Sequence, residues 1–143
     1  MVIIKIKKVK DVKTPEYAHL GDSGVDLHSA EKYELKPMDR VLVSTGIKIA
    51  IPIGYEGQVR PKSGLAIKQG LSVVNTPGTI DAGYRGEVKV IVINLGNETA
   101  LIDEGQKIAQ LVITRVEQAQ FEEVSELDDT SRQEGGFGST GLR

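Results

Sequence analysis

The sequence predicts an all-β domain, and three observations support that prediction. Apolar residues mostly alternate with polar ones or form short β-branched runs, and both patterns are typical of strands. Clusters of Gly, Pro, Asn and Asp separate these runs, as expected for turns. No alternation of strands and long helices is present, so a parallel sheet is not favoured. We therefore predict an antiparallel sandwich, jelly roll or barrel.

The individual elements follow from the same patterns. Strands are predicted at Ile4 and Ile6, Val41 to Val43, Ile47 to Ile53, Val88 to Ile93 and Ile108 to Ile113. Turns are predicted at Gly21 to Gly24, Pro52 to Gly57, Asn75 to Gly78, Gly83 to Gly86 and Gly96 to Glu98. A short helix is expected near Gly64 to Gln69. The segment from Asn75 to Gly86 is expected to form a hairpin, because turn residues stand at both of its ends.

The chain of 143 residues is predicted to be one β domain over residues 1–124, followed by a flexible arm over residues 125–143. The arm is polar and then glycine-rich, so it has few apolar groups to bury. Such an end is usually frayed. Glycines beside Arg132, Ser139 and Thr140 are also a composition suited to binding anions, and both interpretations remain open from the residues alone.

The composition excludes several functional classes. Cysteine is absent and only two histidines are present, which argues against zinc sites and thiol chemistry. A net charge of −2 provides no general attraction to nucleic acid or membranes. No apolar run has the length of a signal peptide or a membrane span. We expect a soluble cytoplasmic protein whose chemistry uses carboxylates, hydroxyls, amides and cations.

Four segments carry residue types suited to such chemistry. Lys62 and Ser63 precede the expected helix, where backbone N–H groups favour an anion, although an ordinary capped helix is equally compatible. Asp26 and Asp81 stand in expected turns, where a carboxylate more often caps the backbone. Gln110 interrupts an apolar strand and must face solvent or a specific partner.

Together with the glycine-rich arm, and in their order along the chain, these four segments resemble the five motifs of the trimeric dUTP diphosphatase (dUTPase) family. The resemblance runs from about Ser23 to Thr140. The motifs appear as Gly24 to Leu27, Pro61 to Ala66, Gly78 to Gly86, Gly105 to Leu111, and Arg132 with Gly135 to Gly141. The resemblance implies a jelly-roll-like antiparallel β-barrel with one short helix. It also implies hydrolysis of dUTP to dUMP and pyrophosphate, which limits uracil in DNA and supplies dUMP for thymidylate synthesis.

The resemblance further implies a role for each site residue. Asp81 would activate the water that attacks the α-phosphate. The third motif would bind uracil through its main chain, and Tyr84 would exclude a ribose 2′-hydroxyl. Gln110 would contact the α-phosphate or the water, and Asp26 would hold waters of a Mg²⁺ ion carried on the triphosphate. The remaining substrate-binding residues would be Lys62, Ser63, Gly64, Asn75, Gly78, Ile80, Arg132, Phe137, Gly138, Ser139 and Thr140.

Family members are homotrimers with sites at the subunit interfaces, so the arm of one subunit is expected to close over a site built by its neighbours. Arg85 is assigned to the subunit framework. Three residues depart from the usual motifs: Lys62 replaces an arginine, Gly83 stands where aspartate is common, and Glu134 lies close to the phosphate-binding end of the arm. Lysine lacks the bidentate fork of arginine, and Glu134 would repel a triphosphate.

Two other functions compete with this interpretation. A dCTP deaminase would share the fold, but that family carries a glutamate ten residues after the third-motif aspartate, and Ile91 occupies that position here. A non-catalytic nucleotide-sensing module would not need Asp81. The sequence therefore favours the diphosphatase.

Overall fold

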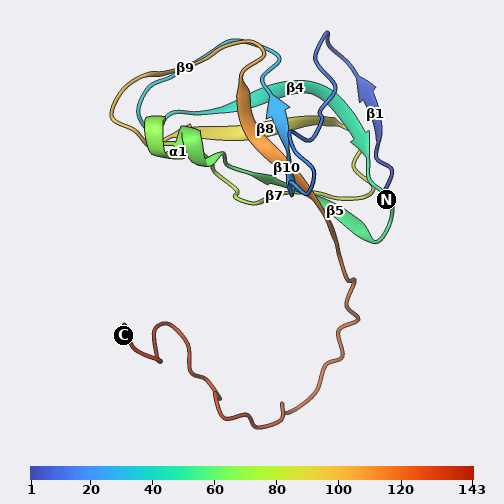
Figure 1. Cartoon of the computed structure of the whole chain (residues 1–143). Helices are drawn as coiled ribbons and strands as arrows, with labels where there is room; N and C mark the ends of the chain where they lie inside the picture. Colours follow the sequence, from blue (N-terminus) through green and yellow to red (C-terminus); the bar gives the residue numbers. More distant parts are fainter.

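The computed structural model covers residues 1–143 and contains ten strands and one short helix (Figure 1). The strands are β1 (Lys5–Lys8), β2 (Gly24–His28), β3 (Tyr33–Leu35), β4 (Arg40–Ala50), β5 (Tyr55–Arg60), β6 (Leu71–Val73), β7 (Gly78–Ile80), β8 (Glu87–Asn94), β9 (Ala100–Ile102) and β10 (Lys107–Arg115). The helix α1 spans Ser63–Gln69. The predicted all-β fold with a single helix is confirmed. No helix in the structure is long and apolar enough to cross a membrane.

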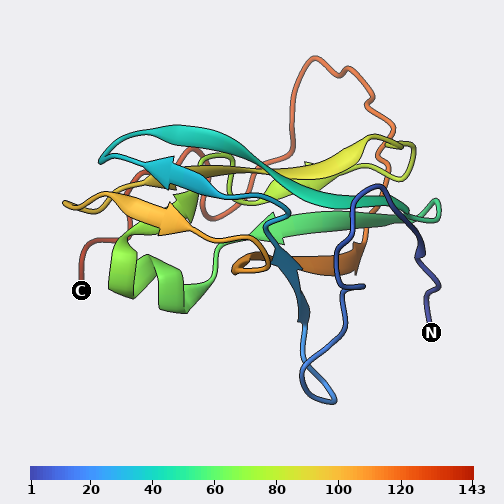
Figure 2. The same ribbon diagram turned by 90° about the horizontal axis from the view of Figure 1, so that it is seen from above.

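The strands form two four-stranded sheets and one two-stranded sheet, and every pair is antiparallel. The first sheet has the order β1-β4-β8-β6, the second has the order β2-β10-β5-β7, and β3 pairs with β9. Two packed antiparallel sheets of this size make the jelly-roll-like architecture that the motifs implied. In Figure 1 and again in Figure 2, α1 lies at the end of the sandwich remote from the N-terminus.

The core lies between the sheets because alternate residues of each strand face inward. On β8, Val88, Val90 and Val92 are each 2% exposed, while Lys89 faces solvent. Nineteen buried apolar residues from β2 to β10 form one continuous cluster. Burial of this β-branched set is the main force that holds the two sheets together.

Two features of the strands differ from the sequence expectation. Val41 to Val43 and Ile47 to Ile53 were expected as separate strands, but Val41 to Ala50 belongs to the continuous β4. Its register shifts between Ser44 and Lys48, where Gly46 has φ of 72° and its carbonyl accepts a hydrogen bond from Val9 N–H (2.8 Å). A bulge thus joins two runs that a glycine had appeared to separate.

Asp26 lies in a strand and not in the expected turn. It belongs to β2, where Val25 and Leu27 point into the core and Asp26 points to the opposite face. The sequence pattern did not predict the strand β2 because this strand has only two core residues and begins at a glycine. Because Asp26 lies in a strand and not in a turn, its carboxylate is in register with residues of the neighbouring strand.

The segment from Asn75 to Gly86 is not a hairpin, since the one strand within it, β7, and the strand that follows it, β8, belong to different sheets. β7 pairs with β5 in the second sheet, whereas β8 pairs with β4 and β6 in the first. The turn after Ile80 therefore crosses the edge of the sandwich, which carries Asp81 and Tyr84 from one sheet to the other.

The C-terminal part of the chain runs away from the body (Figure 1). β10 ends at Arg115, and Val116 N–H still bonds to the Gly54 carbonyl (3.0 Å). Beyond that point no strand or helix forms, and the hydrogen bonds of residues 129–143 join them only to one another. The division at residue 124 remains a prediction, because the course of the chain does not test where an independent domain ends.

Replacing Asn94 tests how far the polar link at the end of β8 stabilises the fold. The side chain of Asn94 is fully buried; its Nδ2 donates to Leu35 O (2.9 Å) and Glu98 O (2.8 Å), and its Oδ1 accepts from Gly96 N–H (2.9 Å). Asn94→Ala leaves these groups without partners, so we expect the free energy of unfolding to fall by about 2 to 4 kcal/mol. Urea denaturation at fixed protein concentration measures this change.

The matched control is Asn97→Ala, because Asn97 is exposed in the following loop. Its free energy of unfolding should stay within about 0.5 kcal/mol of the parent value. Equal stability of the two variants would contradict the role assigned to Asn94.

Candidate functional site

A first group of predicted residues lies on the outer face of the second sheet. In the antiparallel register, Asp26 of β2 stands opposite Gln110 of β10, and Gln110 stands opposite Arg60 of β5. Residues that are direct partners share a face, so these three side chains form one row. Lys62 and Ser63 come shortly after β5, and Lys62 reaches this row through its ion pair with Asp26. We call Asp26, Lys62, Ser63, Lys107 and Gln110 the β2–β10 cluster.

Asp26 is held between two lysines. Its Oδ1 is paired with Lys62 Nζ, and its Oδ2 lies 2.9 Å from Lys107 Nζ. Partial burial opposes ionisation of Asp26, but the hydrogen bonds and positive charges of Lys62 and Lys107 outweigh it, so the pKa of Asp26 lies below its ordinary value. The carboxylate is therefore charged at neutral pH.

Lys107 is the site residue that sequence reasoning passed over. It stood within the fourth motif but received no role, because nothing along the chain connects it to Asp26. In the structure Lys107 of β10 pairs with His28 of β2, and His28 is two residues from Asp26 along the same strand. Only the strand register brings this cation to the carboxylate.

Gln110 has the specific partner that its place in an apolar strand required. Its Nε2 donates to the Pro61 carbonyl (2.9 Å), which attaches β10 to the start of α1. The side chain fits because residue 24 has no Cβ: a Cβ on Gly24 would lie 2.2 Å from Gln110 Oε1. Gly24 of the first motif thus makes room for Gln110 of the fourth.

The start of α1 presents exposed polar groups beside these residues. Lys62 is the N-cap, and no side chain caps the helix, so the ordinary capped helix considered from the sequence is not formed. Ser63 and Gly64 are exposed at its first turn. The Ser63 hydroxyl and the neighbouring N–H groups are free to donate to phosphate oxygens.

A second group of predicted residues surrounds a pocket of about 260 Å³, which we call the third-motif pocket. It is lined on one side by Asn75, Ile80, Asp81 and Tyr84. On the other side it is lined by residues of β4 and β8: Leu42, Glu87, Val88, Lys89 and Ile91. Asn75 lies against Gly78, since a Cβ on Gly78 would be 3.3 Å from Asn75 Nδ2. The structure therefore brings Asn75, Gly78, Ile80, Asp81 and Tyr84 together.

Backbone hydrogen bonds fix the turn that carries Asp81 and Tyr84. Tyr84 N–H donates to the Asp81 carbonyl (3.0 Å), and Arg85 Nη1 donates to the carbonyls of Ala82 (2.6 Å) and Tyr84 (2.9 Å). Within the chain Arg85 thus stabilises its own turn, and its assignment to the subunit framework remains a prediction. The Asp81 side chain is exposed at the pocket.

The β2–β10 cluster and the third-motif pocket lie on different sides of the sandwich. Leu42, Lys89 and Ile91 of the pocket belong to the outer face of the first sheet, where Leu42 pairs with Ile91. Asp26 and Gln110 belong to the outer face of the second sheet. A second depression beside Gln110 reaches Thr76 and Pro77 but includes neither Asp81 nor Tyr84. Within one chain the pocket that holds Asp81 and Tyr84 is therefore lined by neither Gln110 nor Ser63.

The predicted arm residues lie apart from both groups. Arg132 Nε donates to the Gly135 carbonyl (2.7 Å), and Ser139 N–H donates to the Gly136 carbonyl (3.0 Å). Phe137 is fully exposed. Thr140 and Gly138 lie in the same local turns. These residues form local turns at the end of an extended segment that runs away from the two packed sheets of its own chain.

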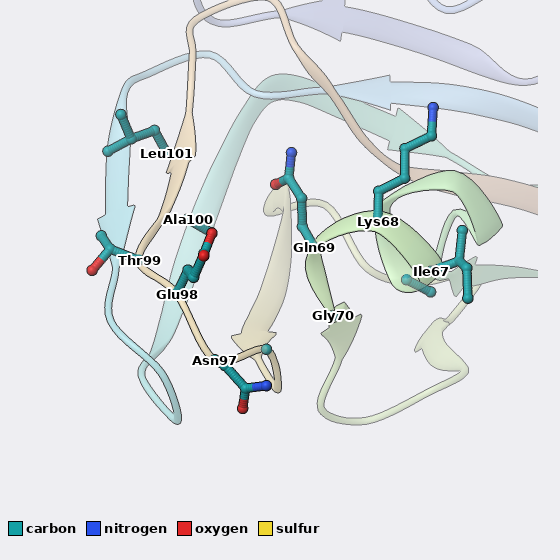
Figure 3. A pocket seen from close by; sticks show the side chains of 11 residues that line it. Ile67, Lys68, Gln69, Gly70, Asn97, Glu98, Thr99, Ala100 and Leu101 are labelled. Atoms are coloured by element: carbon teal, nitrogen blue, oxygen red, sulfur yellow. The ribbon is translucent and has the colours of Figure 1, made fainter.

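A larger cavity, of about 620 Å³, lies elsewhere in the molecule. It separates the end of α1 from the segment Gly96 to Leu101 (Figure 3). Its lining includes Lys68, Gln69 and Glu98 but none of the residues predicted for the site. Cavity size alone therefore does not point to the residues predicted from the motifs.

The residues of the β2–β10 cluster fit a magnesium ion that arrives on a phosphate chain. No three His, Asp or Glu side chains come together as a protein cage for a metal. Asp26 is an ionised carboxylate beside two lysines, and such a group accepts hydrogen bonds from metal-bound waters. The donor set suits an ion that keeps most of its waters.

Comparison with known proteins identifies the family of the chain. The dUTPase family model matches residues 10–141. The chain is 58% identical over 137 residues to the deoxyuridine 5′-triphosphate nucleotidohydrolase of Clostridium kluyveri, with 95% of this chain and 96% of that protein covered. It is 51% identical over 142 residues to the enzyme of the same name from Fusobacterium nucleatum, with 98% and 97% covered.

Solved structures show the same fold. A variant of the dUTPase from Staphylococcus bacteriophage 80alpha, solved with dUpNHpp, superposes with a TM-score of 0.92 at 27% identity, covering 98% of this chain and 99% of that chain. A variant of the dUTPase from phage phi11 of S. aureus, which coordinates a structural Mg(II) ion, superposes with a TM-score of 0.82 at 27% identity, covering 89% and 99%. The chain belongs to the dUTPase family, a class of nucleotide hydrolases with a jelly-roll-like fold.

Replacing Gly24 tests the placement of Gln110. In Gly24→Ala the new methyl group takes the position of the Gln110 carboxamide, which must then leave Pro61. We expect kcat/KM for dUTP to fall by on the order of tenfold while the thermal midpoint changes little, because the methyl meets the flexible end of a side chain. Steady-state kinetics and thermal unfolding separate the two effects.

Ser23→Ala is the matched control, since Ser23 is exposed and adjacent in the chain. It should retain the parent kcat/KM. A Gly24→Ala enzyme with parent kinetics would show that Gln110 does not need its observed position.

Proposed function

We propose that the chain hydrolyses dUTP to dUMP and pyrophosphate, with Asp81 as the general base. The observation that carries this proposal is the exposed Asp81 carboxylate on a rigid turn, at a small pocket shared with Tyr84. A carboxylate in that place can orient a water and accept its proton during attack on the α-phosphorus. Membership of the dUTPase family and the names of the relatives support the substrate.

The third-motif pocket would bind the nucleoside. Its backbone near Asn75, Gly78 and Ile80 presents N–H and carbonyl groups that can pair with the uracil edge. Close approach of this backbone to the C5 edge of the base would exclude the methyl group of thymine, which favours uracil. Tyr84, half-exposed beside Asp81, would lie against the deoxyribose and leave a 2′-hydroxyl without water or a partner.

The β2–β10 cluster would bind the phosphates. Ser63 and Gly64 donate from the start of α1, Lys62 supplies positive charge, and Gln110 is placed to donate to the α-phosphate or the water. Asp26 would hold waters of Mg²⁺, and when bound this ion neutralises charge on the leaving pyrophosphate. Lys62 would contact a phosphate through a single ammonium group, whereas an arginine could make two parallel hydrogen bonds. The ion pair with Asp26 orients this ammonium group.

We further propose a homotrimer in which each site is shared between subunits. The supporting observation is that Asp81 and the β2–β10 cluster lie on different sides of one chain. The arm would complete the site of a neighbour: Arg132, Ser139 and Thr140 would bind the γ-phosphate, Phe137 would stack on uracil, and Gly138 would let the backbone approach. The match to the chain solved with dUpNHpp covers nearly all of the arm.

The proposed reaction would remove dUTP before it reaches DNA and supply dUMP for thymidylate synthesis. Such a role places the enzyme with the nucleotide pool in the cytoplasm. Glu134 would weaken binding of the triphosphate by repulsion if the arm closes as proposed.

The first experiment tests the reaction and its base together. The parent enzyme is incubated with dUTP, dCTP, dTTP or UTP and Mg²⁺, and pyrophosphate and ammonia are measured separately. We expect pyrophosphate from dUTP alone. Asp81→Asn should reduce kcat by at least about 1,000-fold while dUTP still binds, because an amide cannot accept the proton.

Each other outcome rejects a stated part of the proposal. Ammonia from dCTP would identify a deaminase despite Ile91, and no product from any nucleotide would identify a binding module. An unimpaired Asp81→Asn enzyme would remove Asp81 from its role as base.

Mixing two inactive variants tests whether the site is shared. Asp81→Asn keeps the arm but lacks the base, and a chain ending at Ser131 keeps the base but lacks the arm. If the arm serves a neighbour, mixed trimers formed by refolding the two chains together should regain activity. If both parts act within one chain, the mixture should stay as inactive as its components, and parent-like kinetics of the truncated chain alone would reject the role of the arm.

A further inference from the structure

The phenol of Tyr84 lies directly over the backbone of Gly86. A Cβ added to Gly86 would lie 2.3 Å from Tyr84 Oη, 2.6 Å from Cζ and 2.9 Å from Cε2. All three separations are shorter than side-chain atoms tolerate. Position 86 has no unusual φ, so glycine is required there for space and not for backbone conformation.

The tyrosine is therefore supported from two directions. The Gly86 backbone lies beneath the ring, and Tyr84 Oη donates to the Glu87 carbonyl (2.9 Å). Glu87 is itself fixed, since its Oε1 accepts from Ser44 Oγ (3.0 Å), which in turn accepts from Lys10 Nζ (2.8 Å). The ring is held against a rigid part of the first sheet, although nearly half of it faces the pocket.

Gly83 offers a comparison position in the same segment. A Cβ on Gly83 would meet no atom within 4 Å beyond its chain neighbours Ala82 and Tyr84. Gly83 also has no unusual φ. An alanine at position 83 therefore adds the same methyl group without a clash against a residue farther along the chain, which makes it a matched control for Gly86.

We propose that Gly86 is a positioning residue that sets the preference for dUTP over UTP by holding the Tyr84 ring flat against the chain. The inference rests on the proposed function, in which Tyr84 rejects the ribose 2′-hydroxyl. Rejection of one hydroxyl requires a surface that does not yield, because a small outward or sideways shift of the ring leaves space for the oxygen or its water. The absent Cβ of Gly86 allows the ring to occupy its one supported position.

The consequence of a side chain at position 86 follows from these contacts. The methyl group of alanine occupies the place of the phenol end, so the ring must turn away and its hydroxyl must leave the Glu87 carbonyl. Discrimination between deoxyribose and ribose then weakens. The turn that carries Asp81 keeps its backbone hydrogen bonds. The defect appears as a change in selectivity and not only as a loss of rate.

The test compares Gly86→Ala with the matched control Gly83→Ala. For each enzyme kcat/KM is measured with dUTP and with UTP, and the ratio is the readout. We expect Gly86→Ala to lower the dUTP/UTP ratio by about tenfold or more, and Gly83→Ala to leave the ratio near the parent value. A general loss of folding would lower both rates together and leave the ratio unchanged, which would overturn the proposal.

Tyr84→Ala and the double variant Tyr84→Ala/Gly86→Ala complete the cycle. If Gly86 acts through Tyr84, Tyr84→Ala lowers the ratio and the added Gly86→Ala changes it no further. A lowered ratio in Tyr84→Ala with a parent ratio in Gly86→Ala would reject the role of Gly86 alone. A parent ratio in Tyr84→Ala would reject Tyr84 as the sugar gate, and the role of Gly86 would fall with it.

Discussion

The packing of the two sheets against each other is the constraint on which the rest of the molecule depends. β8 lies in the first sheet with Val88, Val90 and Val92 facing the core, whereas the preceding strand β7 lies at the edge of the second sheet. The chain between β7 and β8 then has to cross the rim of the sandwich within a few residues. That crossing is the turn with Asp81 and Tyr84. Core burial thus determines where the acidic and aromatic groups of the third motif are displayed.

Electrostatics then organises the opposite side of the sandwich. A part-buried carboxylate such as Asp26 is stable only with partners, and Lys62 and Lys107 provide them from two different elements. Each lysine is thereby directed towards the place where phosphates would lie. Because the cluster holds two cations for one carboxylate, it retains a positive charge that an incoming triphosphate can neutralise.

The glycines of the motifs contribute space more than flexibility. Gly24 accommodates the Gln110 carboxamide, and Gly86 accommodates the Tyr84 phenol. In both cases the missing Cβ of the glycine allows a polar side chain of another residue to take its observed orientation. A glycine in a short motif can therefore shape a site by leaving space for a side chain that comes from elsewhere in the chain.

The sequence by itself determined the all-β class and a single short helix, which was expected near Gly64 to Gln69 and spans Ser63–Gln69, because period-two burial and turn residues are local properties. It could not show that Asp26 lies in a strand opposite Gln110, that Lys107 joins them, or that Asn75 to Gly86 spans two sheets. Those facts depend on strand register and sheet assignment, which contacts between distant residues decide. The fact that the pocket of Asp81 excludes Gln110 and Ser63 is of the same kind, since it depends on how the two sheets pack.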